Sequence, residues 1–150
     1  MNKKLGRQTV VLADPPSFAG WGNVAGKKEG EGPLGNTFDY IDVDDTFGET
    51  TWEKSESAMQ KQALALALNR AGLAVSQLDY VFAGDLLNQC IGSSYAARGQ
   101  DVPFLGLYGA CSTMGEGLAL AAMVLDGGFG ELAGEEVVSD LCSALREDRT

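Results

Sequence analysis

Histidine is absent from all 150 residues of this sequence. Its absence excludes any Ser-His-Asp triad, Cys-His pair or histidine-bound metal built from these residues alone. Basic residues are also few: 11 Lys and Arg stand against 21 Asp and Glu, which gives a net charge of −10. An acidic chain without a basic stripe is not expected to bind nucleic acid, because nothing in it would neutralise a phosphate backbone.

Cysteine and long apolar runs are scarce as well. Cys90, Cys111 and Cys142 are far apart and form no Cys-x-x-Cys pair, which argues against a structural zinc site and suits a reducing compartment. No apolar run reaches the length of a membrane span, and the basic N-terminus leads only into the short run Val10–Ala13, so no signal peptide is expected. We expect a protein kept inside the cell, with no metal and no cofactor.

The apolar residues that are present predict alternating strands and helices. Strands are expected over Thr9–Ala13, Leu78–Gly84 and Phe104–Tyr108. Helices are expected over Trp52–Leu73, over Cys90–Arg98, and from Cys111 to the glycine pair Gly127-Gly128. This order predicts one α/β domain with a mostly parallel sheet flanked by helices.

The stretch from Ser17 to Gly48 predicts a long loop, rich in Gly, Asp and Pro. Loops of this length are uncommon in compact domains and usually have a function or cover another element. Four aspartates gather in it, namely Asp39, Asp42, Asp44 and Asp45. Their spacing lacks the glycine and the closing glutamate of a calcium loop, which favours a solvated acidic loop over a metal site.

The helix over Trp52–Leu73 carries an amphipathic pattern. Its buried face is predicted to hold Met59, Ala63, Leu66, Ala67 and Arg70, widened by Leu64 and Leu68. Its solvent face is predicted to hold Gln60, Lys61, Gln62 and Asn69. Thr51 or Ser55 is expected to cap its N-terminus, and Gly72 to end it.

Two positions stand where strands end. Cys111 lies where a strand turns into the first turn of a helix, a place that favours a thiolate or binds a carboxylate through the helix dipole. The alternative is that Cys111 is a small buried hydrophobe. Asp85 follows the second strand, where ligands bind in open α/β sheets. Asp85 is equally well interpreted as the N-cap of the next segment. We expect both strand ends to open onto one edge of the sheet.

Four motifs carry a resemblance to a known family: Gly32-Pro33-Leu34-Gly35, Ala83-Gly84-Asp85-Leu86-Leu87-Asn88-Gln89, Gly109-Ala110-Cys111-Ser112-Thr113 and Asp126-Gly127-Gly128-Phe129. Together, over about Gly6 to Gly134, they resemble the stage V sporulation protein AD family, which is similar in fold to thiolases and β-ketoacyl synthases. The resemblance implies that residues 1–134 are the N-terminal half of a thiolase-like fold.

The resemblance also implies a function. Members are expected to bind dipicolinic acid (pyridine-2,6-dicarboxylate) and to act with the SpoVA membrane proteins in its uptake into the developing spore. The site is implied at Asp85, Cys111, Ser112 and Thr113, with Cys111 at the position of the thiolase nucleophile. A peripheral place on the cytoplasmic side of the forespore inner membrane is expected, and a homodimer is allowed. The alternative is a thiolase-like acyltransferase with Cys111 as nucleophile, which the absence of histidine disfavours.

The sequence departs from the family's pattern after Gly134. Residues 135–150 are predicted to be a divergent tail, either a weakly amphipathic helix or a frayed end, and Cys142 in it is given no function. Family members are expected to continue into a second thiolase-like half, so a truncated or frame-altered copy is expected here. A lone half would expose apolar surface and tend to associate or misfold.

Overall fold

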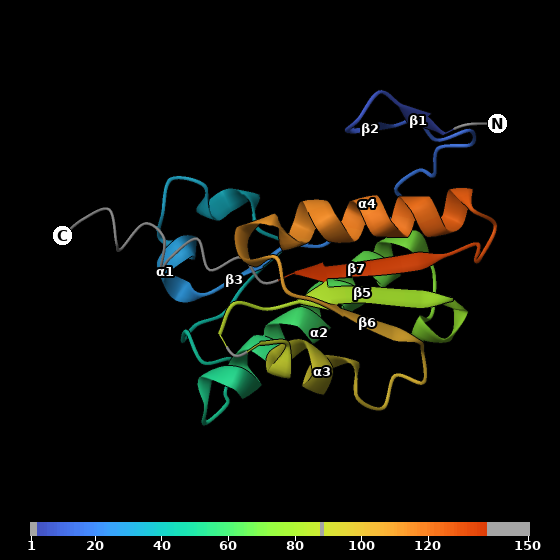
Figure 1. Cartoon of the computed structure of the whole chain (residues 1–150). Coiled ribbons are helices and arrows are strands. Elements are labelled where there is room, and N and C mark those ends of the chain that lie inside the picture. The colour runs from blue at the N-terminus through green and yellow to red at the C-terminus, as the bar shows by residue number, and fades with distance from the viewer. Residues whose placement is uncertain (1–2, 88, 138–150) are drawn as a thin grey trace.

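The computed structural model describes residues 3–87 and 89–137, and it centres on a three-stranded parallel sheet (Figure 1). The strand order is β6-β5-β7, where the strands span Phe104–Leu107, Tyr80–Gly84 and Ala133–Val137. Helix α4 covers one face of the sheet, and α2 and α3 cover the other; these helices span Thr113–Asp126, Trp52–Ala71 and Ile91–Ala97. The predicted α/β class with a parallel sheet flanked by helices is confirmed.

The middle strand β5 is apolar throughout because both of its faces are covered. Val81 and Ala83 point toward α2, where they form a buried cluster with Leu64 and Leu78. Phe82 points to the opposite face and packs with Leu107 and Ala121 under α4. Adjacent residues of one strand therefore supply two separate cores.

Helix α2 begins and ends as predicted, but beside Leu64 its buried surface consists of polar residues. The Thr51 hydroxyl accepts a hydrogen bond from the backbone N–H of Lys54, and Gly72 ends the helix with a left-handed backbone (φ 68°). The buried residues include Ser55, Glu56, Ser57 and Gln60. The prediction that Gln60 faces solvent is wrong, since its side chain is only 1% exposed and hydrogen-bonded beneath β5.

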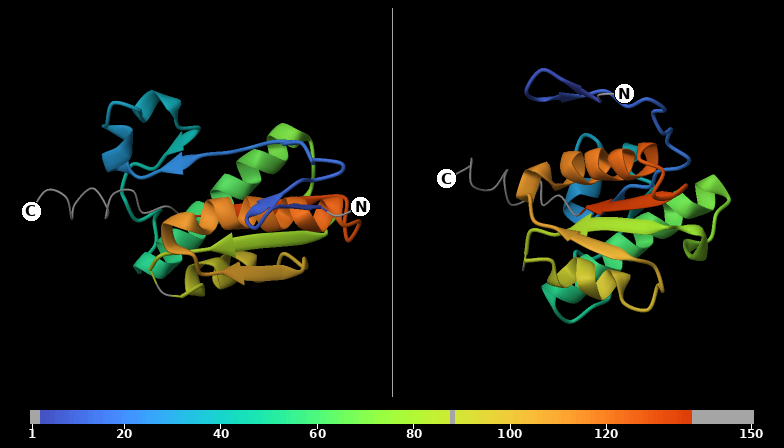
Figure 2. Two further views of the ribbon diagram at one scale, coloured as in Figure 1. Left: turned by 45° about the horizontal axis from the view of Figure 1, so that its top comes forward. Right: turned by 45° about the vertical axis from the view of Figure 1, so that its right-hand side comes forward.

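The predicted first strand does not join the sheet. Only Thr9–Val10 (β2) is a strand, and it pairs antiparallel with Lys4–Leu5 (β1) in a hairpin that stands off beyond α4 (Figures 1 and 2). The hairpin is tied to the end of α4 by Asp126. Its carboxylate lies 2.6 Å from Lys3 Nζ and accepts the backbone N–H groups of Ala13 and Asp14.

The long loop predicted over Ser17–Gly48 packs on helix α2, which agrees with the expectation that such a loop either has a function or covers another element. It runs along α2 (Figure 2) so closely that a Cβ added at Gly22 would lie 2.7 Å from the carbonyl oxygen of Ala63. Arg70 of α2 binds the loop, with its guanidinium donating to Asp39 and to the Trp21 carbonyl oxygen. The loop's own short elements are β3 (Val24–Ala25), α1 (Lys27–Gly30), η1 (Gly35–Thr37) and β4 (Tyr40–Ile41), with β3 and β4 pairing in parallel.

The predicted acidic loop is only partly solvated. Asp42 is buried, and its carboxylate accepts hydrogen bonds from the backbone N–H of Phe47 and the hydroxyl of Tyr40. Asp44 accepts the backbone N–H and hydroxyl of Thr46. In the described part of the chain these carboxylates therefore shape the loop.

The segment after Gly134 is a strand as far as Val137, so the prediction of a helix or frayed tail is wrong there. Strand β7 pairs with β5, Glu135 opposite Phe82 and Glu136 opposite Ala83. The predicted boundary between 134 and 135 falls inside this strand. The rest of the predicted tail, Cys142 included, lies outside the described residues.

None of the helices described is long and apolar enough to cross a membrane.

Candidate functional site at the C-terminal edge of the sheet

The candidate site lies at the edge of the sheet where β5 and β6 both end. Gly84 and Leu107, the last residues of these two strands, are paired in register. The turn after β6 packs directly on the end of β5, because a Cβ at Gly84 would lie 2.6 Å from Cγ2 of Thr113. The expectation that the two strand ends open onto one edge is confirmed by this register.

The turn between β6 and α4 presents Cys111 to solvent. It is a single 3-10 turn, η3 (Ala110–Ser112), and Ala110 adopts a left-handed backbone conformation (φ 49°) that is unfavourable for a non-glycine residue. Cys111 and Ser112 are exposed at the start of α4. The place predicted for Cys111 is therefore observed, and the alternative of a buried hydrophobe does not hold in this structure.

Hydrogen bonds to Gly109 hold the turn together. The Ser112 hydroxyl donates to the Gly109 carbonyl oxygen over 2.6 Å, and the Gly109 N–H donates to the Thr113 hydroxyl over 3.2 Å. An added Cβ at Gly109 would clash first with a carboxylate oxygen of Glu116, in the first turn of α4, and would lie 2.7 Å from the Ser112 hydroxyl oxygen. Thr113 is buried and shapes the turn, which leaves Cys111 and Ser112 as its exposed groups.

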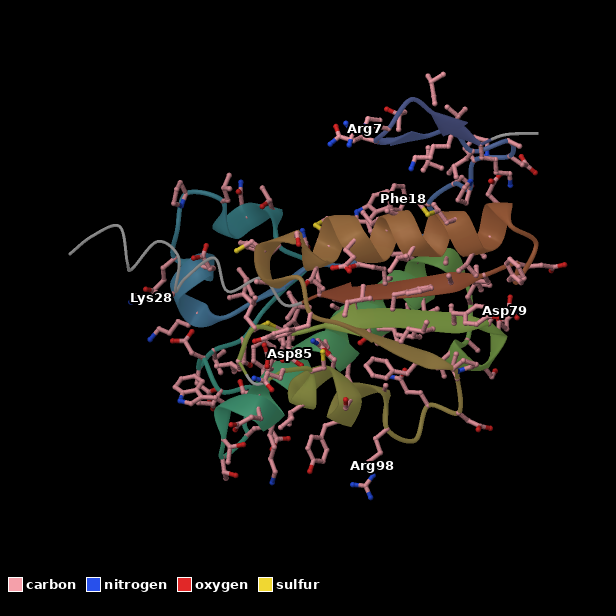
Figure 3. The ribbon with its side chains drawn as sticks, viewed as in Figure 1. Arg7, Phe18, Lys28, Asp79, Asp85 and Arg98 are labelled. Atoms are coloured by element: carbon pink, nitrogen blue, oxygen red, sulfur yellow. The ribbon has the colours of Figure 1, made fainter. Side chains whose placement is uncertain are left out.

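Asp85 is buried and faces the start of α3. Its Oδ1 accepts the backbone N–H of Cys90 over 3.0 Å, and its Oδ2 accepts both the backbone N–H and the hydroxyl of Ser93 over 2.9 Å. Its exposed fraction is 1%. The N-cap residue of α3 is Cys90 and not Asp85, but the Asp85 carboxylate binds the N–H groups at the start of this helix from five residues upstream. Direct contact of Asp85 with a ligand stays a prediction. Figure 3 shows Asp85 at this end of β5 and Asp79 at the other.

A buried polar network between α2, α3 and the end of β5 surrounds Asp85. The amide of Gln60 donates to the carbonyl oxygen of Gly84 over 3.2 Å and to the hydroxyl of Ser93 over 3.1 Å. On the preceding turn of α2, the hydroxyl of Ser57 donates to the carbonyl oxygen of Gly92 over 2.6 Å. These bonds lock α2, α3 and the end of β5 together through polar groups, which are costly to bury unless they are paired.

Cys90 joins the two loops of the site. Its backbone is left-handed (φ 69°), and its thiol lies 2.9 Å from the carbonyl oxygen of Leu107, to which it donates. Burial, and then the negative charge of Asp85, raise the pKa of the Cys90 thiol, so it keeps the proton that this bond requires.

The predicted residues thus divide into two groups. Cys111 and Ser112 face solvent at the turn, while Asp85 and Thr113 are buried and hold the backbone around it. Sequence reasoning missed Gln60, Ser93 and Cys90. The available signal was the four-residue spacing of Glu56, Gln60 and Leu64 on one face of α2, although all but Leu64 are polar. Within the described residues, no group of three or more Cys, Asp or Glu side chains is placed to hold a metal ion.

The turn offers an exposed thiol and an exposed hydroxyl at the positive end of a 14-residue helix, with the carboxylate of Glu116 beside Gly109. A carboxylate or another anion is stabilised in such a place, typically by about 0.3–1 kcal/mol from the dipole alone. The thiol is also accessible to an electrophile. The geometry therefore allows anion binding, covalent chemistry at Cys111, or both.

Comparison with known proteins decides the family. Residues 6–149 match the family model described as stage V sporulation protein AD (SpoVAD). The chain belongs to the SpoVAD family. It is 37% identical over 147 residues to the stage V sporulation protein AD of Bacillus subtilis, and this match covers 98% of the chain but 44% of that relative. The family and this relative are named for sporulation and not for a reaction.

One solved structure, that of OleA, supports the thiolase-like, β-ketoacyl synthase-like fold. OleA of Xanthomonas campestris aligns with a TM-score of 0.51 at 19% identity, covering 77% of this chain and 41% of OleA. A 3-oxoacyl-[acyl-carrier-protein] synthase III from Aquifex aeolicus aligns with a TM-score of 0.49 at 23% identity, covering 65% and 32% of the two chains. The chain thus spans less than half the length of these proteins.

Proposed function

We propose that this chain contributes the dipicolinate-binding turn of a SpoVAD-type protein and acts in the uptake of dipicolinate into the developing spore. The observation that carries the proposal is the exposed pair Cys111 and Ser112 at the N-terminus of α4, in a chain that belongs to a sporulation family. Dipicolinate is a rigid aromatic dianion. One of its carboxylates fits the positive end of the helix, beside the exposed side chains of Cys111 and Ser112.

The buried orientation of Asp85 supports this proposal. A free carboxylate facing the ligand would repel a dianion. Here the carboxylate of Asp85 instead accepts hydrogen bonds from Cys90 and Ser93, at the start of α3. Its charge is therefore partly compensated before any ligand arrives.

Binding is proposed ahead of catalysis. The fold is shared with synthases, and an exposed Cys111 at the start of a helix favours the alternative of an acyltransferase. These 150 residues contain no histidine to act as general acid or base, so acyl transfer by this chain is expected to stop at a thioester. Intact-mass measurement after incubation with acyl-CoA tests this alternative. An adduct absent from Cys111→Ala but present in the parent chain would favour the enzyme.

Protection of Cys111 tests the binding site. Saturating dipicolinate is expected to slow alkylation of Cys111 while leaving that of Cys90 unchanged, with peptide mass mapping to separate the two. Benzene-1,3-dicarboxylate, which has the same spacing of carboxylates without the ring nitrogen, serves as the comparison ligand. An unchanged alkylation rate of Cys111 at saturating dipicolinate would remove the turn from the site.

The proposed partners are the SpoVA membrane proteins, at the cytoplasmic side of the forespore inner membrane. With a net charge of −10, the chain is not expected to adsorb directly to anionic lipid. Flotation with anionic vesicles should leave the purified chain in solution, whereas vesicles that carry SpoVA proteins should retain it. Retention by bare vesicles would contradict this assignment.

A further inference from the structure

The two loops of the candidate site both hold backbone conformations that need external support. Gln89 (φ 52°) and Cys90 (φ 69°) are left-handed just before α3, and Ala110 (φ 49°) is left-handed just before Cys111. Residues other than glycine keep a left-handed backbone only where the surrounding structure holds them in it. The question is which groups supply that support.

For the first loop the support is Asp85. Its two carboxylate oxygens accept the N–H groups of Cys90 and Ser93, which closes the loop after β5 onto the first turn of α3. Ser93 is fully buried, and its hydroxyl oxygen also accepts a hydrogen bond from the Gln60 amide. Asp85 therefore fixes the position of the Cys90 backbone from inside the protein.

The second loop is supported from the first. The Cys90 thiol donates to the carbonyl oxygen of Leu107, the last residue of β6, over 2.9 Å. From Leu107 the chain passes only through Tyr108 to Gly109, whose N–H and carbonyl oxygen hold Thr113 and Ser112. A continuous set of contacts therefore leads from Asp85 through Cys90 and Leu107 to the turn that carries Cys111.

We infer that Asp85 and Cys90 are positioning residues: they set the geometry of the Gly109–Thr113 turn through the Cys90–Leu107 hydrogen bond, without contacting the ligand. The inference deepens the proposed function and rests on it only for the ligand readout. The conformation of the turn can be measured without any ligand.

The test compares four variants by amide hydrogen exchange in the segment 108–113. Cys90→Ala removes the thiol donor and is expected to speed exchange there roughly three- to tenfold, the loss of one net hydrogen bond. Cys90→Ser restores a donor and should return the rate toward that of the parent chain. Asp85→Asn should reproduce the effect of Cys90→Ala, because an amide cannot accept at both positions.

Asp79→Asn is the matched control. Asp79 lies at the opposite end of β5, and its carboxylate likewise accepts two backbone N–H groups, those of Glu131 and Leu132 at 2.7 and 3.0 Å (Figure 3). Both bonds go to the same oxygen, which the amide of asparagine retains, so this substitution removes a carboxylate charge at the far end of β5 and should leave exchange in 108–113 unchanged. If Asp85→Asn fails to fold, the Cys90→Ala and Cys90→Ser pair decides the inference.

Dipicolinate titration of the same variants separates this inference from the proposed function. Weakened binding in both Cys90→Ala and Asp85→Asn, with recovery in Cys90→Ser, is the expected result. Unchanged exchange in 108–113 in Cys90→Ala, with binding lost only in Asp85→Asn, would overturn the inference and make Asp85 a ligand contact. Altered exchange in a chain that never binds dipicolinate would refute the proposed function and leave the positioning role in place.

Discussion

Glu135 of β7 packs against Gly117 of α4, so closely that a Cβ added to Gly117 would lie 2.7 Å from Cγ of the glutamate. Glu136, the next residue, points to the other face of the sheet, toward α2, and is 4% exposed. Among the described residues, neither Oε1 of Glu135 nor either carboxylate oxygen of Glu136 has a hydrogen-bond partner. Strand β7 therefore places one poorly compensated carboxyl group on each face of the sheet.

This arrangement predicts that the chain loses stability as the pH rises from about 4.5 to 7. Burial raises the pKa of Glu135 and of Glu136 from 4.5 to about 7. In the unfolded chain both carboxyls ionise at the lower pH, so ionisation favours unfolding throughout this interval. The charge of Glu135 raises the pKa of Glu136 further, and the charge of Lys61 only partly opposes this. The free energy of unfolding that Glu136 alone removes is roughly 3 kcal/mol.

Urea unfolding at pH 5 and pH 7.5 measures this effect. Glu136→Gln should be more stable than the parent chain at pH 7.5 and should flatten the pH dependence. Glu131→Gln changes an exposed glutamate just before the same strand. It is the control and should leave the pH dependence of stability unchanged. A parent chain that is equally stable at both pH values would show that these carboxyls are not buried in solution.

Gln60→Ala is expected to destabilise the chain by about 1–3 kcal/mol, because it leaves the Gly84 carbonyl oxygen and the Ser93 hydroxyl without their donor in a buried place. Asn69→Ala, on the exposed surface of the same helix, is expected to stay within about 0.5 kcal/mol of the parent chain. Thermal unfolding of the two variants compares them directly. Equal effects would mean that the polar face of α2 is not buried.

Gly22→Ala and Gly115→Ala should change stability in opposite directions. At Gly22 the new Cβ would meet the Ala63 carbonyl oxygen and the Leu66 Cβ, each at 2.7 Å, and we expect a loss of about 1–3 kcal/mol. At Gly115, inside α4, no atom beyond its own helix backbone and chain neighbours lies within 4 Å, so the better helix former should add up to about 1 kcal/mol. Chemical denaturation tests both. A neutral Gly22→Ala would show that the long loop does not pack on α2.

The exposed methionines of α4 predict self-association. Met114 and Met123 are 56% and 42% exposed on α4, the helix that covers one face of the sheet (Figure 1). Paired substitution by glutamine should shift sedimentation velocity toward the monomer. The same change at Leu34 and Val43, which are also exposed but lie in the long loop, should not. If the two double variants sediment alike, the surface of α4 is not where copies of the chain meet.

The sequence predicts strands β5 and β6 and the limits of α2 well because its signals there are local and redundant. The apolar run of β5, the capping threonine at 51 and the glycine at 72 each define an element without reference to distant residues. The turn that carries Cys111 is predicted for the same reason. A strand followed within two residues by Gly109 and then by a helical pattern leaves few other conformations.

The parts that sequence reasoning missed depend on distant contacts. Gln60 is buried because it hydrogen-bonds to Gly84 and Ser93, which lie 24 and 33 positions further along the chain. Strand β7 forms although its sequence contains two adjacent glutamates, because β5 offers a free edge for pairing. The Asp85 carboxylate binds the N–H groups at the start of a helix that begins six residues later, beyond the reach of any local capping motif.

The most direct test of the proposed function is a calorimetric titration of dipicolinate into the chain, its Cys111→Ala and Ser112→Ala variants, and a Ser76→Ala control. Ser76 is an exposed serine in the 3-10 turn η2 (Val75–Gln77), just before β5. We predict saturable binding that both turn variants weaken several-fold and the control leaves unchanged. Absence of heat at millimolar ligand, or equal affinity in all four proteins, would contradict a dipicolinate site at the start of α4.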